Sequence, residues 1–488
     1  MTTSTDAPIT RASVGLRSER GPVLLAVMLS TGLVAIDATI LAAAVPAVVR
    51  DLGGLSQFPW LFSIYLLAQA VSVPVYGKVA DLVGRKPVML VGIGLFVVGS
   101  LLCGAAWSMG SLVAFRLVQG LGAGAVAPVG MTIVGDIYSV AERAKVQGYI
   151  ASVWAISSLV GPTLGGVFAD YLSWRWIFLV NLPLGLAAAW MLWRRFDEQR
   201  AVRDADAPRP RIDVLGTLLL LGGTVALLVA LLEGGVLWAW SSPESIALLV
   251  GSAVALVAFV LVERRAAEPV LPLWVFRHRV VGAAMAISLV VGVLLLGLTS
   301  YVPLFAQGVL GTGAIVAGFA LAAMTIGWPI AASTSGRLYL RFGFRATTLL
   351  GSVIALAGAA LLLTIDGSSS VLHLALPNFV MGLGFGYAAS PSIVAAQSSV
   401  GWRQRGVATG ATLFARSVGS AVGVAAFGAL ANGVVRSRLG SDPSNLESLP
   451  AGVLEPAIHA VFVASFAVAV LLVVAAAFMP RRVDEVTD

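Results

Sequence analysis

Residues 21–49 read GPVLLAVMLSTGLVAIDATILAAAVPAVV, an apolar run that contains a single charged residue, Asp37. A helix that crosses the hydrocarbon core of a bilayer needs about 20 apolar residues, so this run predicts a transmembrane helix. A charge at the centre of a bilayer costs at least about 2.5 kcal/mol and commonly faces a wet cavity, a partner charge or an ion. Asp37 is therefore a candidate proton or cation site. The alternative is a carboxylate that only ties two helices together.

The rest of the chain repeats this apolar pattern. Of its 488 residues, 58% are hydrophobic and 11% are charged, whereas soluble domains carry about 25% charged residues. We expect an all-α integral membrane protein with fourteen spans. The predicted spans are residues 22–46, 57–76, 87–106, 110–134, 146–170, 174–193, 212–232, 245–263, 279–306, 314–336, 346–364, 372–395, 405–430 and 456–479.

The positions of the basic residues predict the orientation. Lysine and arginine collect in the cytoplasmic loops of membrane proteins. With the N-terminus inside, most of the 31 lysines and arginines lie in inner loops and tails, and the even number of spans places both termini there. We predict a multi-pass protein of the bacterial plasma membrane with both termini cytoplasmic. The net charge of +7 follows from this topology and requires no nucleic-acid partner.

The remaining composition argues against enzymatic and metal chemistry. Cys103 is the only cysteine, and the three histidines are scattered along the chain. Neither residue type forms a metal-ligand cluster, and no nucleophile–base set or phosphate-binding loop is recognisable. We expect no enzymatic activity, no metal and no cofactor. The expected partners are the lipid bilayer, hydrophobic small molecules and protons, the proton-motive force is the expected energy source, and the expected state is a monomer.

The chain divides into two similar parts. We predict a tail (1–21), a six-helix half (22–193), a basic linker with two extra spans at about 212–232 and 245–263 (194–278), a second six-helix half (279–479) and a tail (480–488). Two repeated six-helix halves around a central site are typical of secondary transporters. Four positions recur 262 residues later: Arg143 as Arg405, Gly148 as Gly410, Ser157 as Gly419 and Gly161 as Gly423.

The loop between the second and third spans carries a charged motif, Gly77-x-x-x-Asp81-x-x-Gly84-Arg85-Lys86. Its glycines permit a tight turn, and its charges can pair across the ends of helices. A weaker copy covers residues 336–345, 259 residues later, where leucine replaces the aspartate. A merely basic inner loop is the alternative interpretation.

The fourth span carries a second unusual charge, Arg116, followed by glycines that allow close helix approach. At 1.5 Å per residue, Asp37 lies roughly 22 Å from the inner surface and Arg116 about 9 Å below the outer one. In a core about 30 Å thick, the two residues lie at nearly the same level. The sequence therefore allows them to interact.

The fifth span combines small residues with a proline. A proline inside a helix removes a backbone hydrogen bond and kinks the helix, and glycines create a smooth face for packing. Generic packing of small residues is the alternative. The residues of this motif are Gly148, Ser157, Gly161, Pro162, Gly165 and Gly166.

These motifs carry a family resemblance. The loop at 77–86 resembles the signature of the major facilitator superfamily, and the fifth-span motif resembles its antiporter motif. Further stretches at 37–46, 174–183, 301–307 and 405–416 resemble the fourteen-span drug:proton antiporter family, the EmrB/QacA type. The resemblance implies a gating latch of Asp81 and Arg85 that favours the outward-facing state, with Asp136 as the acid that partners Arg85. It also associates Arg116 with proton transfer.

The resulting functional prediction is proton-coupled multidrug efflux of hydrophobic, cationic or neutral, small molecules by alternating access. In this hypothesis Asp37 binds a proton or a substrate cation in turn. The alternatives are export of an endogenous lipid or metabolite, and a non-transporting membrane protein that binds lipid or signals. Candidate residues lining the cavity are Tyr301, Gln307, Trp328, Asn378 and Arg416.

Overall fold

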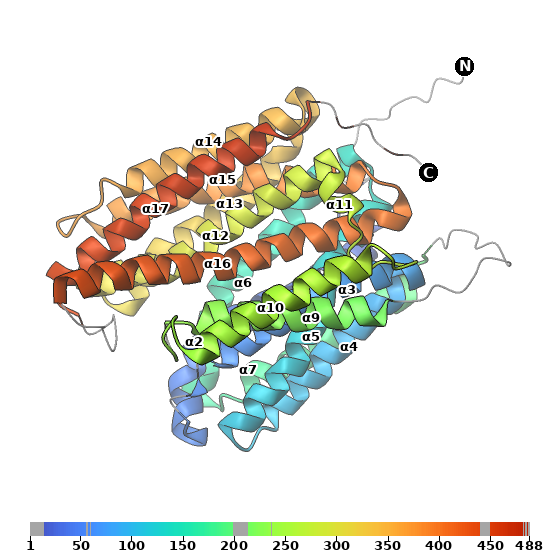
Figure 1. Cartoon of the computed structure of the whole chain (residues 1–488). Helices are drawn as coiled ribbons and strands as arrows, with labels where there is room; N and C mark the ends of the chain where they lie inside the picture. The colour runs from blue at the N-terminus through green and yellow to red at the C-terminus, as the bar shows by residue number, and fades with distance from the viewer. Residues whose placement is uncertain are drawn as a thin grey trace.

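The computed structural model describes residues 14–54, 57–58, 60–198, 213–235, 237–439, 449–481, 483 and 486. It is a bundle of long helices (Figure 1), and 14 of the described helices are long and apolar enough to cross a membrane. The predicted all-α architecture with fourteen spans is therefore confirmed. Most of the two predicted tails, and residues 199–212 and 236 of the predicted linker, fall outside the described residues.

The helices follow one another with short connections. Three shorter pieces are α7 (Trp176–Leu179), α11 (Trp274–Arg277) and the 3-10 helix η2 (Trp402–Gln404). The long helices are α2 (Gly21–Leu52), α3 (Trp60–Val83), α4 (Arg85–Gly104), α5 (Met109–Ile137), α6 (Val140–Tyr171), α8 (Asn181–Arg195), α9 (Val214–Glu233), α10 (Pro243–Glu263), α12 (Arg279–Gly308), α13 (Ala314–Phe342), α14 (Phe344–Leu362), α15 (Val371–Ser398), α16 (Arg405–Leu439) and α17 (Ala451–Ala477).

Several helices differ from the apolar runs that predicted them. The helix α2 continues beyond its predicted end to Leu52 and stops at Gly53, whose φ of 67° suits a glycine at a helix C-terminus. The helix α16 extends to Leu439, and α7 and α8 divide the sixth predicted span. An apolar run marks the thickness of the hydrocarbon core, whereas backbone hydrogen bonds continue a helix into polar surroundings.

The two groups of six helices use the same packing pattern. In the first group, α2 packs against α6 and α8, while α5 packs against α3 and α4. In the second, α12 packs against α16 and α17, while α15 packs against α13 and α14. A glycine with positive φ separates α3 from α4 (Gly84, 108°) and α13 from α14 (Gly343, 86°), and these two glycines are 259 residues apart.

The two groups meet through two equivalent interfaces. The helix α3 packs against α16, and α6 packs against α13. A Cβ added to Gly77 would lie 2.5 Å from the carbonyl oxygen of Gly406, and one added to Gly336 would overlap Ala144. Gly336 follows Gly77 by 259 residues and Gly406 follows Ala144 by 262, so each contact repeats the other. Glycine at these positions permits close backbone approach.

The two extra spans lie on one side of this arrangement. The helices α9 and α10 pack against each other (Figure 1), and α9 also packs against both α3 and α16. It therefore contacts one helix from each half.

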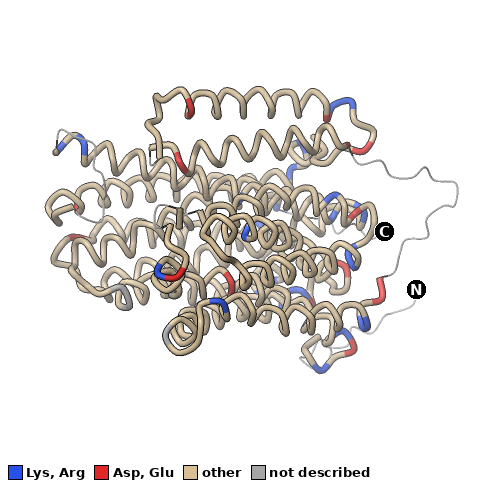
Figure 2. Tube along the Cα trace, turned by 90° about the horizontal axis from the view of Figure 1, so that it is seen from below, with Lys and Arg blue, Asp and Glu red and all other residues tan. Residues whose placement is uncertain are grey.

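Charged residues gather toward the helix ends, and the long middle sections carry few of them (Figure 2). The start of α2 and the segment after α17 lie at the same end of the bundle. There the Arg20 guanidinium lies 5.5 Å from the centre of the Tyr138 ring, and the amide of Val486 donates to the Ser398 carbonyl at 3.0 Å. This end also carries the 77–86 loop, and we refer to it as the basic end.

Candidate functional site

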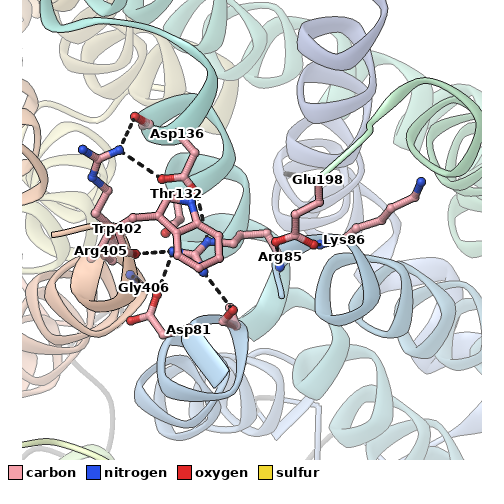
Figure 3. Close-up of polar contacts among 12 residues, drawn as sticks. Asp81, Arg85, Lys86, Thr132, Asp136, Glu198, Trp402, Arg405 and Gly406 are labelled. Atoms are coloured by element: carbon pink, nitrogen blue, oxygen red, sulfur yellow. Dashed lines mark hydrogen bonds and ion pairs between the residues drawn. The ribbon is translucent and has the colours of Figure 1, made fainter. Parts of the chain in front are cut away.

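Arg85 forms the centre of a charged cluster at the basic end (Figure 3), and its side chain is fully buried. Its Nε donates to Asp136 Oδ2 at 2.8 Å, and its Nη2 lies 3.0 Å from Asp81 Oδ1. The same Nη2 donates to the Trp402 carbonyl at 2.5 Å, and the guanidinium lies 3.7 Å from the centre of the Trp402 ring. The planar fork of arginine suits this set of carboxylate, carbonyl and aromatic partners.

Asp81 connects the two halves directly. Its Oδ1 accepts from the backbone amide of Gly406 at 2.9 Å, and its Oδ2 accepts from the amide of Val407 at 2.8 Å. Both amides belong to the first turn of α16, where free N–H groups and the helix dipole favour a negative charge. The carboxylate of one half therefore caps a helix of the other half.

Asp136 forms a second bridge between the halves. Its Oδ2 accepts from Arg85, and its Oδ1 lies 3.2 Å from Nη1 of Arg405. The repeat relates Arg405 to Arg143 and Asp136 to Ser398, and Arg143 Nη1 donates to Ser398 Oγ at 3.3 Å. The same contact therefore occurs twice, once with a carboxylate and once with a hydroxyl.

The segments that flank the two extra spans also hold this loop. Glu198 accepts from the backbone amides of Arg85 at 2.6 Å and Lys86 at 3.2 Å, at the start of α4 (Figure 3). Glu268, which follows α10, pairs with Lys78 at 2.6 Å. We refer to Asp81, Arg85, Asp136, Trp402 and Arg405, with the amides at 406 and 407, as the latch.

Asp37 lies in a second cluster within the first half. It is 1% exposed. Its Oδ2 lies 2.5 Å from Nη1 of Arg116, and its Oδ1 accepts from Gln119 at 2.8 Å and from Asn181 at 3.3 Å. The ion pair between Asp37 and Arg116, which their similar predicted depth in the membrane allowed, is therefore present. Its members come from α2, α5 and α8.

Arg116 has further partners of its own. Its Nε donates to the Leu61 carbonyl at 3.1 Å, its Nη1 donates to Gln119 Oε1 at 2.7 Å, and it lies 4.1 Å from the centre of the Tyr65 ring. Buried ion pairs need such additional bonds, because desolvation is costly. All these partners belong to the first half, so the pair lies inside one six-helix group and not between the two.

The fifth-span motif packs in two places along α6. Near the basic end, Gly148 faces Ser333 of α13 in the other half. Further along, a Cβ added to Gly161 would overlap the Thr39 hydroxyl, which donates to the Ser157 carbonyl at 3.0 Å. The second contact lies two residues from Asp37 along α2.

The other motif residues make fewer contacts. The helix α6 continues through Pro162, which is exposed, and does not end there. Gly165 is buried, and a Cβ added to Gly166 would meet nothing within 4 Å. Packing therefore explains Gly148, Ser157 and Gly161 more directly than the end of the motif.

The predicted cavity residues have different surroundings. Tyr301 is buried. Trp328 is partly buried, with its ring edge-on to Phe385 at 5.9 Å between centres. Gln307 is exposed and donates to the Pro303 carbonyl of its own helix at 3.4 Å.

Asn378 is fully buried. Its amide nitrogen donates to the Leu374 carbonyl at 2.8 Å, and its Oδ1 has no hydrogen-bond partner among the described residues. It follows Arg116 by 262 residues, so the second half carries an amide where the first carries a guanidinium. Arg416 is partly buried and lies about one third of the way along α16.

Sequence reasoning missed some members of these clusters. Gln119 lies three residues after Arg116, so helical spacing places it on the same face. Asn181 is an amide within a predicted span, which is a signal in itself. Glu198 and the backbone groups of residues 402, 406 and 407 carry no comparable signal.

Among the described residues, fourteen helices long and apolar enough to span a membrane, two similarly packed halves and a charged cluster between them are typical of a secondary membrane transporter. The sequence-family model of the Major Facilitator Superfamily matches residues 27–424, and the chain belongs to this superfamily.

Its relatives include named drug transporters. The chain is 33% identical to the multidrug transporter protein MdtP of Bacillus subtilis over 418 residues, which cover 86% of this chain and 76% of the relative. It is 33% identical to multidrug resistance protein 3 of the same organism over 417 residues, which cover 86% of this chain and 80% of the relative.

A solved structure shares the fold. The human organic anion transporter MFSD10 superposes with a TM-score of 0.65 at 16% identity, over 94% of this chain and 99% of that one.

Proposed function

We propose that this protein is a proton-coupled exporter of hydrophobic small molecules. The observation that carries the proposal is the buried Asp37–Arg116 pair, an ionisable pair at mid-membrane depth inside one half of a superfamily transporter. Intramembrane acids of this kind are typical of proton relays. The named multidrug transporters among the relatives support export of drug-like molecules.

We further propose that the basic end faces the cytoplasm of a bacterial plasma membrane, with both termini inside. The excess of lysine and arginine in the loops of that end supports this orientation. The latch joins the two halves at the same end, so this conformation is closed toward the cytoplasm. In this proposal Asp37 receives its proton from the opposite side, where protons are more abundant. We propose a monomer as the working unit.

In the proposed cycle, a proton from outside binds Asp37. A neutral carboxyl group attracts Arg116 less, and the donors of Gln119 and Asn181 compete for fewer acceptor sites. The arrangement of α2 and α5 that the charge pair holds then weakens. The Thr39 contact with α6 lies two residues from Asp37, so α6 and its interface with α13 respond to the same change.

The energy scale is sufficient for uphill export. One charge moving through 100 mV yields about 2.3 kcal/mol, and 1.36 kcal/mol corresponds to a factor of ten. One proton therefore supports accumulation of roughly fifty-fold. Because the carboxylate is buried and its oxygens are occupied by protein donors, we assign proton binding to Asp37 and no contact with a substrate cation.

The test uses purified protein reconstituted in liposomes with an imposed pH gradient. The probes are a cationic dye (ethidium), a neutral dye (Nile red) and an anionic one (pyrenebutyrate). We expect gradient-driven transport of at least one dye, and Asp37→Asn is expected to abolish its dependence on the gradient. Asp366→Asn, which removes an exposed loop acid, is the matched control.

Asp37→Glu keeps the charge and serves as a second variant where Asp37→Asn fails to fold. We expect it to retain a pH-dependent but slower transport. Gradient-driven transport by Asp37→Asn at the wild-type rate would contradict the assigned proton site. Absence of flux of every dye by the folded wild-type protein would contradict export and favour a non-transporting membrane protein.

A further inference from the structure

Arg416 is a mid-membrane charge that the proton mechanism does not use. It lies about eleven residues into α16, and neither an ion pair nor a side-chain hydrogen bond joins it to any described residue. By contrast, Arg85, Arg116 and Arg405 each contact a carboxylate. A permanent charge at this depth requires water or a ligand to compensate it.

The neighbours of Arg416 on its helix show which way this face points. Leu413, one turn toward the basic end, clusters with Val73 of α3 and Ile393 of α15. Ser420, one turn in the other direction, donates to the Gly292 carbonyl of α12 at 3.3 Å. Residues three and four apart share a helix face. Arg416 therefore lies on the face of α16 that is turned toward other helices of both halves.

The cluster next to Arg416 closes the bundle toward the basic end. Val73, Ile393 and Leu413 are 4%, 2% and 3% exposed, and Ala127 and Met131 of α5 pack against them. Arg416 is partly exposed and lies one turn beyond this floor on a face turned toward helices of both halves, where a ligand held between the halves would meet its guanidinium.

A second unpaired polar group lies close by. Ser288 of α12 is one turn from Gly292 on the same helix face, and Gly292 packs directly against the backbone of Arg416. The Ser288 hydroxyl is buried and has no hydrogen-bond partner among the described residues. Both unpaired groups therefore lie along the α12–α16 contact.

The charge balance decides the ligand class. Asp37 and Arg116 neutralise each other within the first half. No carboxylate among the described residues forms an ion pair with Arg416, so its positive charge is not neutralised by the protein. A guanidinium binds a carboxylate or sulfonate through two parallel hydrogen bonds. We infer that Arg416 is the substrate-recognition residue for anions, and that the exported molecules include hydrophobic compounds with a carboxylate or sulfonate group. This inference rests on the proposed export function and specifies its substrate class.

The test measures binding of three probes that share one aromatic body. Pyrenebutyrate is anionic, pyrenebutanol is neutral and pyrenebutylammonium is cationic. Their binding to the purified full-length protein in detergent is followed by pyrene fluorescence. We expect Arg416→Gln to raise the Kd of pyrenebutyrate by about tenfold or more, which corresponds to about 1.4 kcal/mol. The Kd of pyrenebutanol is expected to change by less than about threefold.

The matched control is Arg438→Gln, which removes an exposed charge from the last turn of the same helix. It is expected to leave all three affinities unchanged. Arg416→Lys keeps the charge without the planar fork and is expected to weaken pyrenebutyrate less than Arg416→Gln does. It also provides the comparison where the glutamine variant does not fold.

Equal loss of affinity for all three probes in Arg416→Gln would overturn the inference, as would wild-type affinities that do not depend on probe charge. The assay uses no proton gradient, so its outcome is separate from that of the transport test. Selective anion binding without gradient-driven transport would reject proton-coupled export and keep Arg416 as an anion site. Gradient-driven transport without charge-selective binding would keep proton-coupled export and reject Arg416 as an anion site.

Discussion

The carboxylate of Asp81 accepts a hydrogen bond of 2.8 Å from the backbone amide of Val407, so an acid of the first half caps a helix of the second. The equivalent helix of the first half, α6, has a local cap instead. Ser139 Oγ accepts from the Glu142 amide at 3.3 Å, and Glu142 Oε2 accepts from the Ser139 amide at 2.9 Å. The amide cap of α16 therefore depends on the closed arrangement of the halves, and the amide cap of α6 does not.

Asp81→Asn is expected to weaken closure at the basic end. A hydrogen bond to a charged group contributes about 1.5–3 kcal/mol, so the population open at this end is expected to rise by about tenfold or more. The reporter is Leu413→Cys, from the nearly inaccessible floor, in a Cys103→Ser background. Its labelling by a membrane-impermeant maleimide in inside-out vesicles is expected to be faster in Asp81→Asn. Labelling at an unchanged rate would show that the cap does not hold the closed state.

Arg85→Lys is expected to lose most dye efflux although it keeps the positive charge. Arg85 donates to Asp136, a main-chain carbonyl and Trp402, and it stacks on the Trp402 ring. An ammonium group does not reproduce that planar set. Lys86→Arg is the control, because among the described residues Lys86 Nζ makes a single hydrogen bond, to the Phe196 carbonyl at 2.6 Å. Equal efflux by wild type and Arg85→Lys would contradict the assigned geometry.

Gly161→Ala is expected to force α6 away from α2, because the added methyl group overlaps the Thr39 hydroxyl. Overpacking of this kind typically costs about 1–3 kcal/mol. We expect a lower Tm and slower efflux, with partial recovery in the Thr39→Ala/Gly161→Ala double variant. Gly166→Ala adds the same methyl group where nothing lies within 4 Å and should behave as wild type. Similar losses in both single variants would point to helix flexibility and not to this contact.

Asp51, at the end of α2 away from the basic end, predicts a pH effect. Hydrogen bonds from the Trp174 indole and from Arg175 hold the pKa of Asp51 below its ordinary value of 3.8. Because the pKa is lower in the folded state, the contribution of Asp51 to stability is present above the ordinary pKa and is lost as the pH falls through the folded value. The Tm difference between wild type and Asp51→Asn should be constant from pH 7 to pH 5 and shrink below about pH 4. A difference that shrinks between pH 7 and pH 5 would contradict this assignment.

The fold was predictable because each membrane span is a run of apolar residues that is long enough to cross the bilayer. The similar membrane depth of Asp37 and Arg116 was also predictable, since a helix rises by about 1.5 Å per residue. Helix ends were less predictable: α2 runs on to Leu52 and α16 to Leu439, because hydrogen bonding and not hydropathy ends a helix.

The latch was only half visible in the sequence. The charges of residues 77–86 and Asp136 indicated ion pairing, but the partners of Asp81 are backbone amides 325 and 326 residues away. Every residue except proline has a main-chain N–H group, so the sequence does not indicate which one will donate to Asp81. Only the packing of α3 against α16 reveals the donors. The burial of Asp37 was likewise unpredictable, because one span does not show which side of a helix faces the neighbouring spans.

The central claim is that substrate export is coupled to a proton carried by Asp37. Proton release from weakly buffered, detergent-purified protein on addition of pyrenebutanol tests it most directly, since this neutral probe carries no titratable group. We predict that the wild-type protein releases protons on binding once the pH is low enough for Asp37 to carry one, and that Asp37→Asn binds the probe over the same pH range without releasing any. Equal proton release by wild type and Asp37→Asn would contradict the account.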